Sequence, residues 1–168
     1  MRVYSASLVL PITAPPIPGG AIAVAGGRIR HVGDREWVVH ELRARGVAFD
    51  EVHWPGVLAP GLVNAHSHLQ YTGMAEVGRG SYAGFDDWDD AFTPVYRAGH
   101  DWAQDAAAGA HEMIAAGTTA VADIVTDVEA ASALHDARLH GITYWEVMSW
   151  TNAAWAERGR AEVEARLD

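Results

Sequence analysis

Short apolar runs and amphipathic segments alternate along the second part of the chain. Three runs are apolar and rich in β-branched residues, as expected for strands buried on both faces: Val57–Ala65, Thr118–Val125 and Ile142–Met148. Between the first two, His100–Ala116 places apolar residues at helical spacing, and Gly117 follows where a helix commonly ends. This alternation predicts an α/β fold with a parallel sheet.

Two further helices and one loop complete this part of the pattern. Asp127 is suited to cap a helix that runs to His140, and Asn152–Leu167 has a helical composition with Gly159 as its weak point. Glycines recur through Gln70–Gly84, which predicts a long loop. The acidic residues that follow predict the first turn of another helix, where the helix dipole favours negative charge: Asp86, Asp87, Asp89 and Asp90.

The N-terminal third has the pattern of a small β-rich domain. Val3–Leu10 alternates as a strand does. Ile22–Val24 and Arg28–Val32 can pair in a hairpin around Gly26-Gly27, which are favoured turn residues. A short helix and a returning strand are expected next, over Trp37–Arg45 and Val47–Val52.

A pair of histidines lies at the end of the first strand predicted for the α/β part. His66 and His68 are separated by one residue, so in an extended strand both imidazoles point to the same face, about 6.6 Å apart along the axis. Two imidazoles at that separation can share one metal ion. Polar groups at the carboxyl end of a buried strand are also where α/β barrels place their chemistry. The spacing alone leaves open that both are ordinary surface histidines.

Two longer motifs give this pair its context. Residues 60–69 read PGLVNAHSHL, which resembles the first barrel strand of the amidohydrolase superfamily. Residues 21–34 read AIAVAGGRIRHVGD and are similar to a hairpin of the small β-sandwich domain that precedes the barrel in that family. The resemblance implies part of a β-sandwich over residues 1–56 and part of a TIM-type (β/α) barrel over residues 57–168. A whole barrel needs about 250 residues, so we expect its first three βα units here, with the C-terminal part missing.

The same resemblance implies a metal-dependent hydrolase. His66 and His68 would bind Zn or another divalent transition metal such as Fe, which makes water nucleophilic near neutral pH. In the superfamily the other histidine ligands and the proton-shuttling aspartate come from later barrel strands. We therefore expect no catalytic residue within this chain and no activity of the chain alone. The number of metal ions stays open.

The deaminase branch of the superfamily offers the nearest match to the features around the predicted site. Gln70 follows the histidine pair by two residues, and Glu146 precedes Val147 in the third strand; both are predicted to bind the substrate. The leading hypothesis is hydrolytic deamination of an amino-heterocycle, namely aminodeoxyfutalosine or a related nucleoside. One alternative is hydrolysis of a cyclic amide or a chloro-heterocycle. Another is a non-catalytic truncated fragment or a complementing subunit.

Asp123 is a carboxylate inside an apolar strand, and a buried carboxylate needs partners. One interpretation is a hydrogen bond to a neighbouring strand or loop. The other is a supporting role behind the residues that bind the metal.

The amino-acid composition limits the binding partners and the cellular compartment that are expected for this protein. A net charge of −10 argues against binding to nucleic acid or to anionic membranes. The absence of cysteine excludes disulfides and thiolate metal sites. No segment has the length and hydrophobicity of a membrane span, so a cytoplasmic protein with a small-molecule substrate is expected. Open strand edges in a partial barrel would favour a homo-oligomer or a complementing C-terminal chain.

Overall fold

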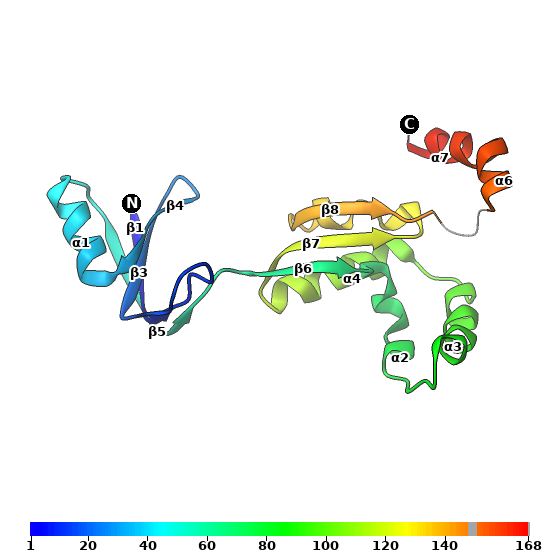
Figure 1. The fold of residues 1–168 in the computed structure, drawn as a ribbon, viewed down its shortest axis with the longest axis horizontal. Coiled ribbons are helices and arrows are strands. Elements are labelled where there is room, and N and C mark those ends of the chain that lie inside the picture. The colour runs from blue at the N-terminus through cyan, green and yellow to red at the C-terminus, as the bar shows by residue number, and fades with distance from the viewer. Residues whose placement is uncertain (148–150, 168) are drawn as a thin grey trace. The chain divides into compact units, whose positions relative to one another are not determined.

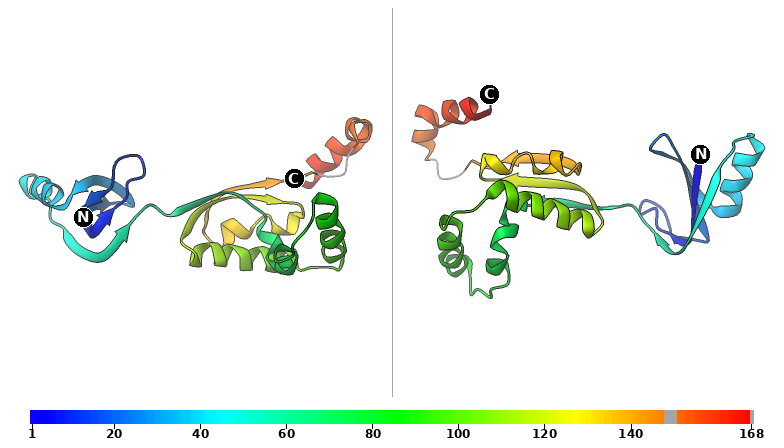
Figure 2. Two further views of the ribbon diagram at one scale, coloured as in Figure 1. Left: turned by 60° about the horizontal axis from the view of Figure 1, so that its bottom comes forward. Right: turned by 180° about the vertical axis from the view of Figure 1, so that it is seen from behind.

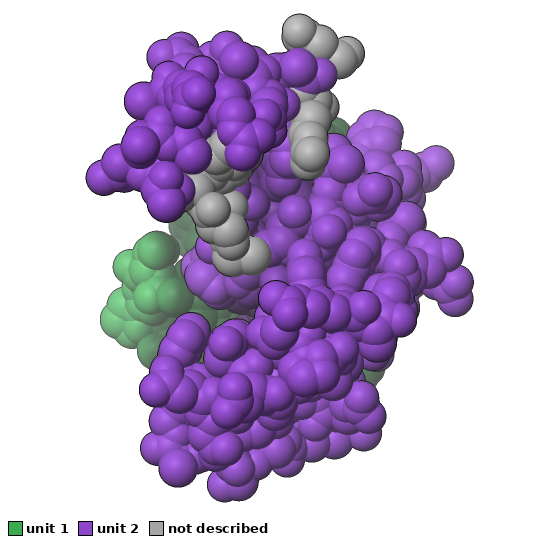
Figure 3. Space-filling view, turned by 90° about the vertical axis from the view of Figure 1, so that its right-hand side faces the viewer, with its two compact units in different colours: residues 1–60 green, residues 61–168 purple. Residues whose placement is uncertain are grey.

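The computed structural model describes residues 1–147 and 151–167. The chain divides into two compact units, Met1–Pro60 and Gly61–Asp168, which Figure 3 colours separately. The boundary predicted after residue 56 lies inside the last strand of the first unit. Each unit has its own sheet, as Figure 1 shows.

A mixed sheet of five strands forms the first unit. Its path runs through β2 (Ile17–Pro18), β1 (Arg2–Val9), β3 (Gly20–Ala25) and β4 (Arg28–Asp34), and β5 (Asp50–Leu58) also pairs with β1. Strand β1 is antiparallel to β2 and β3 and parallel to β5. The predicted hairpin of β3 and β4 is confirmed. Both glycines of its turn have positive φ, a conformation that glycine adopts without strain.

Helix α1 (Arg35–Ala44) packs against the sheet and completes the core of the first unit. Its residues Val38 and Leu42 are fully buried and cluster with apolar residues of β1 and β3. Asp34 caps the helix, because its carboxylate accepts hydrogen bonds from two backbone N–H groups of the first turn. The short helix predicted here is confirmed, whereas the strand predicted to start at Val47 begins later, with β5.

The second unit is built on a parallel sheet of three strands. Strands β6 (Leu62–Ser67), β7 (Thr118–Val125) and β8 (His140–Trp145) pair in that order, and both pairings are parallel. Figure 1 shows the three strands side by side. The predicted α/β arrangement is confirmed, and β7 has the bounds that its apolar run predicted.

The first of these strands differs from its predicted range, Val57–Ala65. Val57 and Leu58 belong to β5 and pair with β1 in the first unit. Pro60 has no amide hydrogen for a strand ladder, and the pairing stops before it. Strand β6 therefore begins after this break and includes His66.

Helix α4 (Trp102–Ala115) connects β6 with β7 and covers one face of the parallel sheet, together with the short helix α5 (Ala133–Asp136) (Figure 2). The predicted helix His100–Ala116 is thus confirmed. Gly109 permits close packing, because a Cβ there would lie 2.7 Å from the carbonyl oxygen of Leu69. Buried residues from the strands and helices form one core: Leu69, Ala106, Ala110, Val121, Val125, Ala130, Ala133, Leu134 and Leu139.

The parallel sheet also carries large apolar side chains that no part of the described chain covers. Leu62 and Val63 in β6 and Ile142 and Tyr144 in β8 each expose half or more of their surface. A parallel sheet normally has both faces covered. This exposed apolar surface is available for contact with another protein segment.

Helical turns replace most of the loop predicted over Gln70–Gly84. The 3-10 helix η1 (Leu69–Met74) and the short helix α2 (Ala75–Gly78) follow β6, and then comes α3 (Phe85–Arg97). The loop prediction was wrong because buried side chains anchor these turns, including Gln70. The acidic first turn predicted for α3 is confirmed.

The segments after β7 and β8 also differ in detail from their predictions. Instead of one helix from Asp127 to His140, a 3-10 helix η2 (Val128–Ala130) precedes α5, and Asp127 makes no capping hydrogen bond. The predicted C-terminal helix is divided into three segments: α6 (Asn152–Ala154), a π-helical turn (Trp155–Gly159) and α7 (Arg160–Leu167). None of the helices in the described ranges is long and apolar enough to cross a membrane.

Candidate metal centre

The two predicted metal ligands lie together at the carboxyl end of β6. His66 is in the strand, and its backbone N–H donates to the side-chain oxygen of Asn64 at 3.2 Å. His68 is the next residue after the strand and is the N-cap residue of η1. Their ring centroids are 5.3 Å apart. The strand end thus presents two adjacent imidazoles, while metal binding by them stays a prediction.

His68 is the more constrained of the two rings. It stacks on Tyr71 of η1, with ring centroids 4.9 Å apart and planes inclined by 10°. His66 is exposed, whereas His68 is partly buried. The Nδ1 atom of His68 is buried and has no hydrogen-bond partner among the residues that the structure describes. The stacking fixes the plane of this ring, and one of its nitrogens faces the protein interior.

Asp123, in the adjacent strand β7, is fully buried beside this segment. Its Oδ1 atom accepts a hydrogen bond from the backbone N–H of Leu69 at 2.9 Å, which confirms the predicted bond to a neighbouring loop. Its Oδ2 atom is buried and unpaired within the described residues. Burial raises the pKa of this carboxyl above its ordinary value, while the Leu69 N–H and a positive charge on His68 would lower it. The carboxyl group is therefore within electrostatic reach of the His68 ring.

The donor set fits part of a metal shell. Imidazole is a common protein ligand of zinc, iron and other transition metals. Within residues 1–147 and 151–167, no group of three or more His, Asp or Glu side chains is placed to hold a metal ion. A catalytic zinc ion usually has three protein ligands and one open position. His66 and His68 can supply two of these ligands, and the others would have to be added.

Gln70 lies beyond the end of β6, in η1, where the chain turns away from the strand direction. Its side chain is fully buried. Its Nε2 atom donates to the Thr126 hydroxyl and to the Asp127 carboxylate, both at 2.8 Å, and its Oε1 atom accepts from the backbone N–H of Thr126 at 2.9 Å. The amide thus connects η1 to the end of β7. Substrate contact by Gln70 stays a prediction, and the geometry supports an anchoring role.

Asp127 is the centre of this hydrogen-bond network, which the sequence analysis did not identify. Its Oδ2 atom accepts from Gln70, from the Thr126 hydroxyl at 2.9 Å and from the Tyr96 hydroxyl at 2.7 Å. The pattern assigned Asp127 only a capping role. Its place directly after the carboxyl end of a parallel strand was the available signal, because functional side chains gather there. The network ties α3 to the same sheet edge as the histidine pair.

Glu146 follows β8 directly, and its backbone N–H donates to the carbonyl oxygen of Val125 at 2.7 Å. The third strand therefore ends before this residue, and Met148, its predicted last residue, lies outside the described residues. The side chain of Glu146 is exposed. Burial raises the pKa of Tyr71, and the negative charge of Glu146 raises it further. Glu146 thus lies on the same edge of the sheet as Tyr71, and its substrate contact stays a prediction.

A series of aromatic rings leads from the histidine pair onto α3. Tyr71, which stacks on His68, contacts Phe92 edge to face at a centroid distance of 5.3 Å. On α3, Phe92 stacks with Trp88 at 4.6 Å and with Tyr96 at 5.6 Å. These rings lie at intervals of four residues along the helix, so they share one face. The series provides flat apolar surfaces near the candidate metal ligands.

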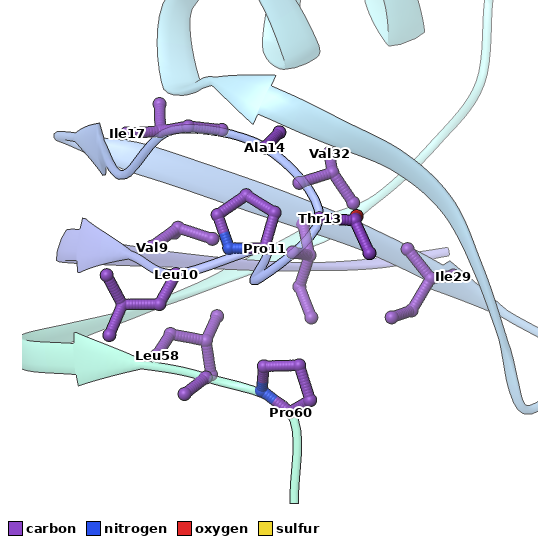
Figure 4. A pocket seen from close by; sticks show the side chains of 12 residues that line it. Val9, Leu10, Pro11, Thr13, Ala14, Ile17, Ile29, Val32, Leu58 and Pro60 are labelled. Carbon is purple, nitrogen blue, oxygen red and sulfur yellow. The ribbon is translucent and has the colours of Figure 1, made fainter.

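An apolar cavity in the first unit has a different chemical character. Its volume is about 390 Å³, and Figure 4 shows its apolar lining, which includes Val9, Ile17, Ile29, Leu58 and Pro60. Thr13 is the one hydroxyl residue in this lining. With no titratable side chain in its wall, the cavity offers no acid, base or metal ligand.

Comparison with known proteins places the sequence in a family. The model of the amidohydrolase family matches residues 57–166. This chain belongs to the amidohydrolase family. The resemblance carried by the PGLVNAHSHL segment is thereby confirmed. No curated protein gives a significant match to the sequence.

Several solved structures share the fold of this amidohydrolase chain. An adenosine deaminase from Xanthomonas campestris with bound zinc has a TM-score of 0.61 and 23% identity over 99% of this chain and 40% of its own. An aminofutalosine deaminase from Helicobacter pylori, in complex with methylthio-coformycin, has a TM-score of 0.72 and 15% identity over 98% of this chain and 40% of its own. A triazine hydrolase from Arthobacter aurescens has a TM-score of 0.64 and 17% identity, over 91% of this chain and 37% of its own. The chain thus spans about two fifths of the length of these proteins.

Proposed function

We propose that this chain contributes the first three strand–helix units of a (β/α) barrel to a metal-dependent amidohydrolase. The family match and the three consecutive strands in one parallel sheet support this. The observation that carries the proposal is the adjacent pair of imidazoles, His66 and His68, at the carboxyl end of the first of these strands. Barrel enzymes hold their reacting groups at that end of the strands. The remaining strands would come from further residues of the same protein or from a partner chain.

His66 and His68 would hold Zn or another divalent transition metal such as Fe. When bound, such an ion acts as a Lewis acid and makes water acidic enough to be a nucleophile near neutral pH. Tyr71 keeps the His68 ring in its plane by stacking on it. Gln70 and Asp127 hold η1, and with it Tyr71, against the end of β7. The chain's own residues therefore position the ligands, and the catalytic acid or base would come from outside it.

The proposed reaction is hydrolysis of a C–N bond in an amino-heterocycle, with release of ammonia. Aminodeoxyfutalosine or a related nucleoside is the leading candidate substrate, supported by the fold shared with the aminofutalosine deaminase. The aromatic face of α3 offers surfaces on which a planar ring could stack. Glu146 is exposed at the same sheet edge and could contact the substrate directly, whereas Gln70 would act through the segment that it anchors.

A second candidate reaction is hydrolysis at a chloro-substituted heterocycle. The fold shared with the triazine hydrolase supports a nitrogen heterocycle as the substrate of such a hydrolysis. The two leading candidates release different products, ammonia in one case and chloride in the other. A panel of aminopurines, aminopyrimidines, aminodeoxyfutalosine and chlorotriazines would separate them when both ions are measured.

A partner for this chain is part of the proposal. The apolar residues exposed on the parallel sheet support a contact with a second copy or with a complementing chain that covers them: Leu62, Val63, Ile142 and Tyr144. A purely complementing role, without chemistry of its own, remains the competing hypothesis. Sedimentation analysis of the purified chain, alone and with any longer product of its gene, distinguishes a monomer from an assembly.

The metal content of the protein tests the central part of the proposal. His66→Ala with His68→Ala removes both imidazoles, whereas His40→Ala with His111→Ala removes two exposed histidines elsewhere and serves as the control. After equilibration with zinc and removal of excess ion, we expect the control to retain the zinc of the wild type. The His66/His68 variant should lose most of it. Full zinc occupancy in that variant would refute the proposal.

A further inference from the structure

Two buried polar atoms near the histidine pair have no hydrogen-bond partner in the described part of the chain: Nδ1 of His68 and Oδ2 of Asp123. Buried polar atoms are nearly always paired, because leaving one unpaired costs about 1–3 kcal/mol. One of these atoms can donate a proton and the other can accept it. A donor and an acceptor that are both unpaired in the same region indicate that the two groups can form a hydrogen bond with each other.

The backbone keeps the two side chains close to each other. Strands β6 and β7 pair in parallel with Ser67 opposite Asp123, so His68 is the next residue along from that pair. The following residue, Leu69, donates its N–H to Oδ1 of Asp123 at 2.9 Å. The Asp123 carboxylate is thus held by the residue after His68, while the residue before His68 lies opposite Asp123 in the strand pairing. The second carboxylate oxygen, Oδ2, has no hydrogen-bond partner within the described residues.

We propose that Asp123 is a positioning residue that accepts a hydrogen bond from Nδ1–H of His68 and so keeps Nε2 of His68 deprotonated and available to a metal ion. This inference rests on the proposed function for the metal, but the hydrogen bond itself does not require one. A histidine that binds a metal typically donates its other ring N–H to a carboxylate or a carbonyl, which fixes the tautomer and the ring orientation. Asp123 would provide that carboxylate, and Tyr71 would hold the ring plane.

A simpler interpretation assigns Asp123 a structural role only. In that case its one function is to accept the Leu69 N–H through Oδ1, and the tautomer of His68 is set by other factors. The two interpretations predict different effects of Asp123→Asn. The amide oxygen of asparagine can still accept from Leu69, so a structural role is largely preserved. Its NH₂ group would then face His68 and donate to Nδ1, which forces the proton onto Nε2.

The decisive measurement is the tautomer of His68 in the full metal-free chain. Long-range ¹H–¹⁵N spectra at about pH 8.5, some two units above the ordinary imidazole pKa, distinguish a proton on Nδ1 from one on Nε2. We expect the Nδ1–H tautomer in the wild type and a shift to Nε2–H in Asp123→Asn. Asp136→Asn makes the same chemical change at an exposed carboxylate of α5 and should leave the His68 tautomer unchanged. An Nε2–H tautomer in the wild type would overturn the inference without any variant, as would an unchanged tautomer in a folded Asp123→Asn.

Zinc affinity supplies a second, independent test. Loss of a carboxylate that supports a ligand typically lowers metal affinity 10- to 100-fold. Competition with a chromophoric chelator should show that decrease in Asp123→Asn and less than a threefold change in Asp136→Asn. Equal zinc affinity in the wild type and Asp123→Asn would overturn the role toward the metal. If His66 and His68 bind no zinc at all, the proposed function fails, and the tautomer spectra still decide the hydrogen bond.

Discussion

Gln70→Ala separates an anchoring role of this side chain from a contact with substrate. The substitution removes two hydrogen bonds donated by Nε2 and one accepted by Oε1. A bond to a neutral partner contributes about 1 kcal/mol and one to a charged partner about 1.5–3 kcal/mol. Because the side chain is fully buried, its loss also leaves the Thr126 N–H without this acceptor. We therefore expect Gln70→Ala to destabilise the second unit by about 3–5 kcal/mol.

The assay is urea denaturation followed through the amide resonances of β7. With a slope of about 2 kcal/mol per molar urea, the expected loss lowers the midpoint by roughly 2 M. Gln104→Ala is the control, because Gln104 is exposed on α4 and its substitution should change stability by less than about 0.5 kcal/mol. Gln70→Glu places a second carboxylate against Asp127 and should destabilise the unit at neutral pH. An unchanged midpoint in Gln70→Ala would refute the anchoring role and favour a direct substrate contact.

Three further predictions concern activity, packing and electrostatics. The 168-residue chain alone, supplied with zinc, should release ammonia from aminodeoxyfutalosine no faster than a zinc solution without protein. The reason is that two imidazoles form an incomplete catalytic shell. Faster release of ammonia than in the zinc solution would contradict this prediction. Leu42→Ala opens a cavity in the core of the first unit and should reduce the unfolding free energy of that unit by about 2–5 kcal/mol, measured by chemical denaturation. A loss below about 1 kcal/mol would contradict this prediction. The hydrogen bond from Arg35 lowers the pKa of Glu51, so this pair stabilises the fold above the ordinary carboxyl pKa and that contribution is lost as the pH falls. Glu51→Gln should accordingly reduce stability by at most about 1 kcal/mol at neutral pH and by progressively less as the pH falls below the ordinary carboxyl pKa. A difference that grows on acidification would show that the sign is wrong.

Features that depend on local sequence were predicted well. The hairpin around Gly26-Gly27 formed as expected, because two adjacent glycines allow the left-handed backbone that its turn requires. The strand Thr118–Val125 has its predicted bounds, since a β-branched run between breakers has few other conformations. The placement of His66 and His68 at one strand end also follows from local sequence, because an apolar run leads directly into the pair.

Features that depend on pairing partners were predicted less well. Val57 and Leu58 fit a strand equally well in either sheet, and only their pairing with β1 assigns them to the first unit. Gln70 has the same polarity whether it faces substrate or interior, so its burial could not be read from its position in the sequence.

The sequence by itself determined the family, the parallel α/β core and the pair of candidate metal ligands, because each is written in a short continuous segment whose chemistry does not depend on distant residues. Tertiary structure decided which polar groups support that pair. The contacts of Asp123 with Leu69 and of Gln70 with Thr126 and Asp127 join residues more than fifty positions apart. Such contacts form only when packing places a buried donor opposite a buried acceptor. Hydrophobic periodicity carries no information about that match, because it distinguishes polar from apolar positions but not one polar partner from another.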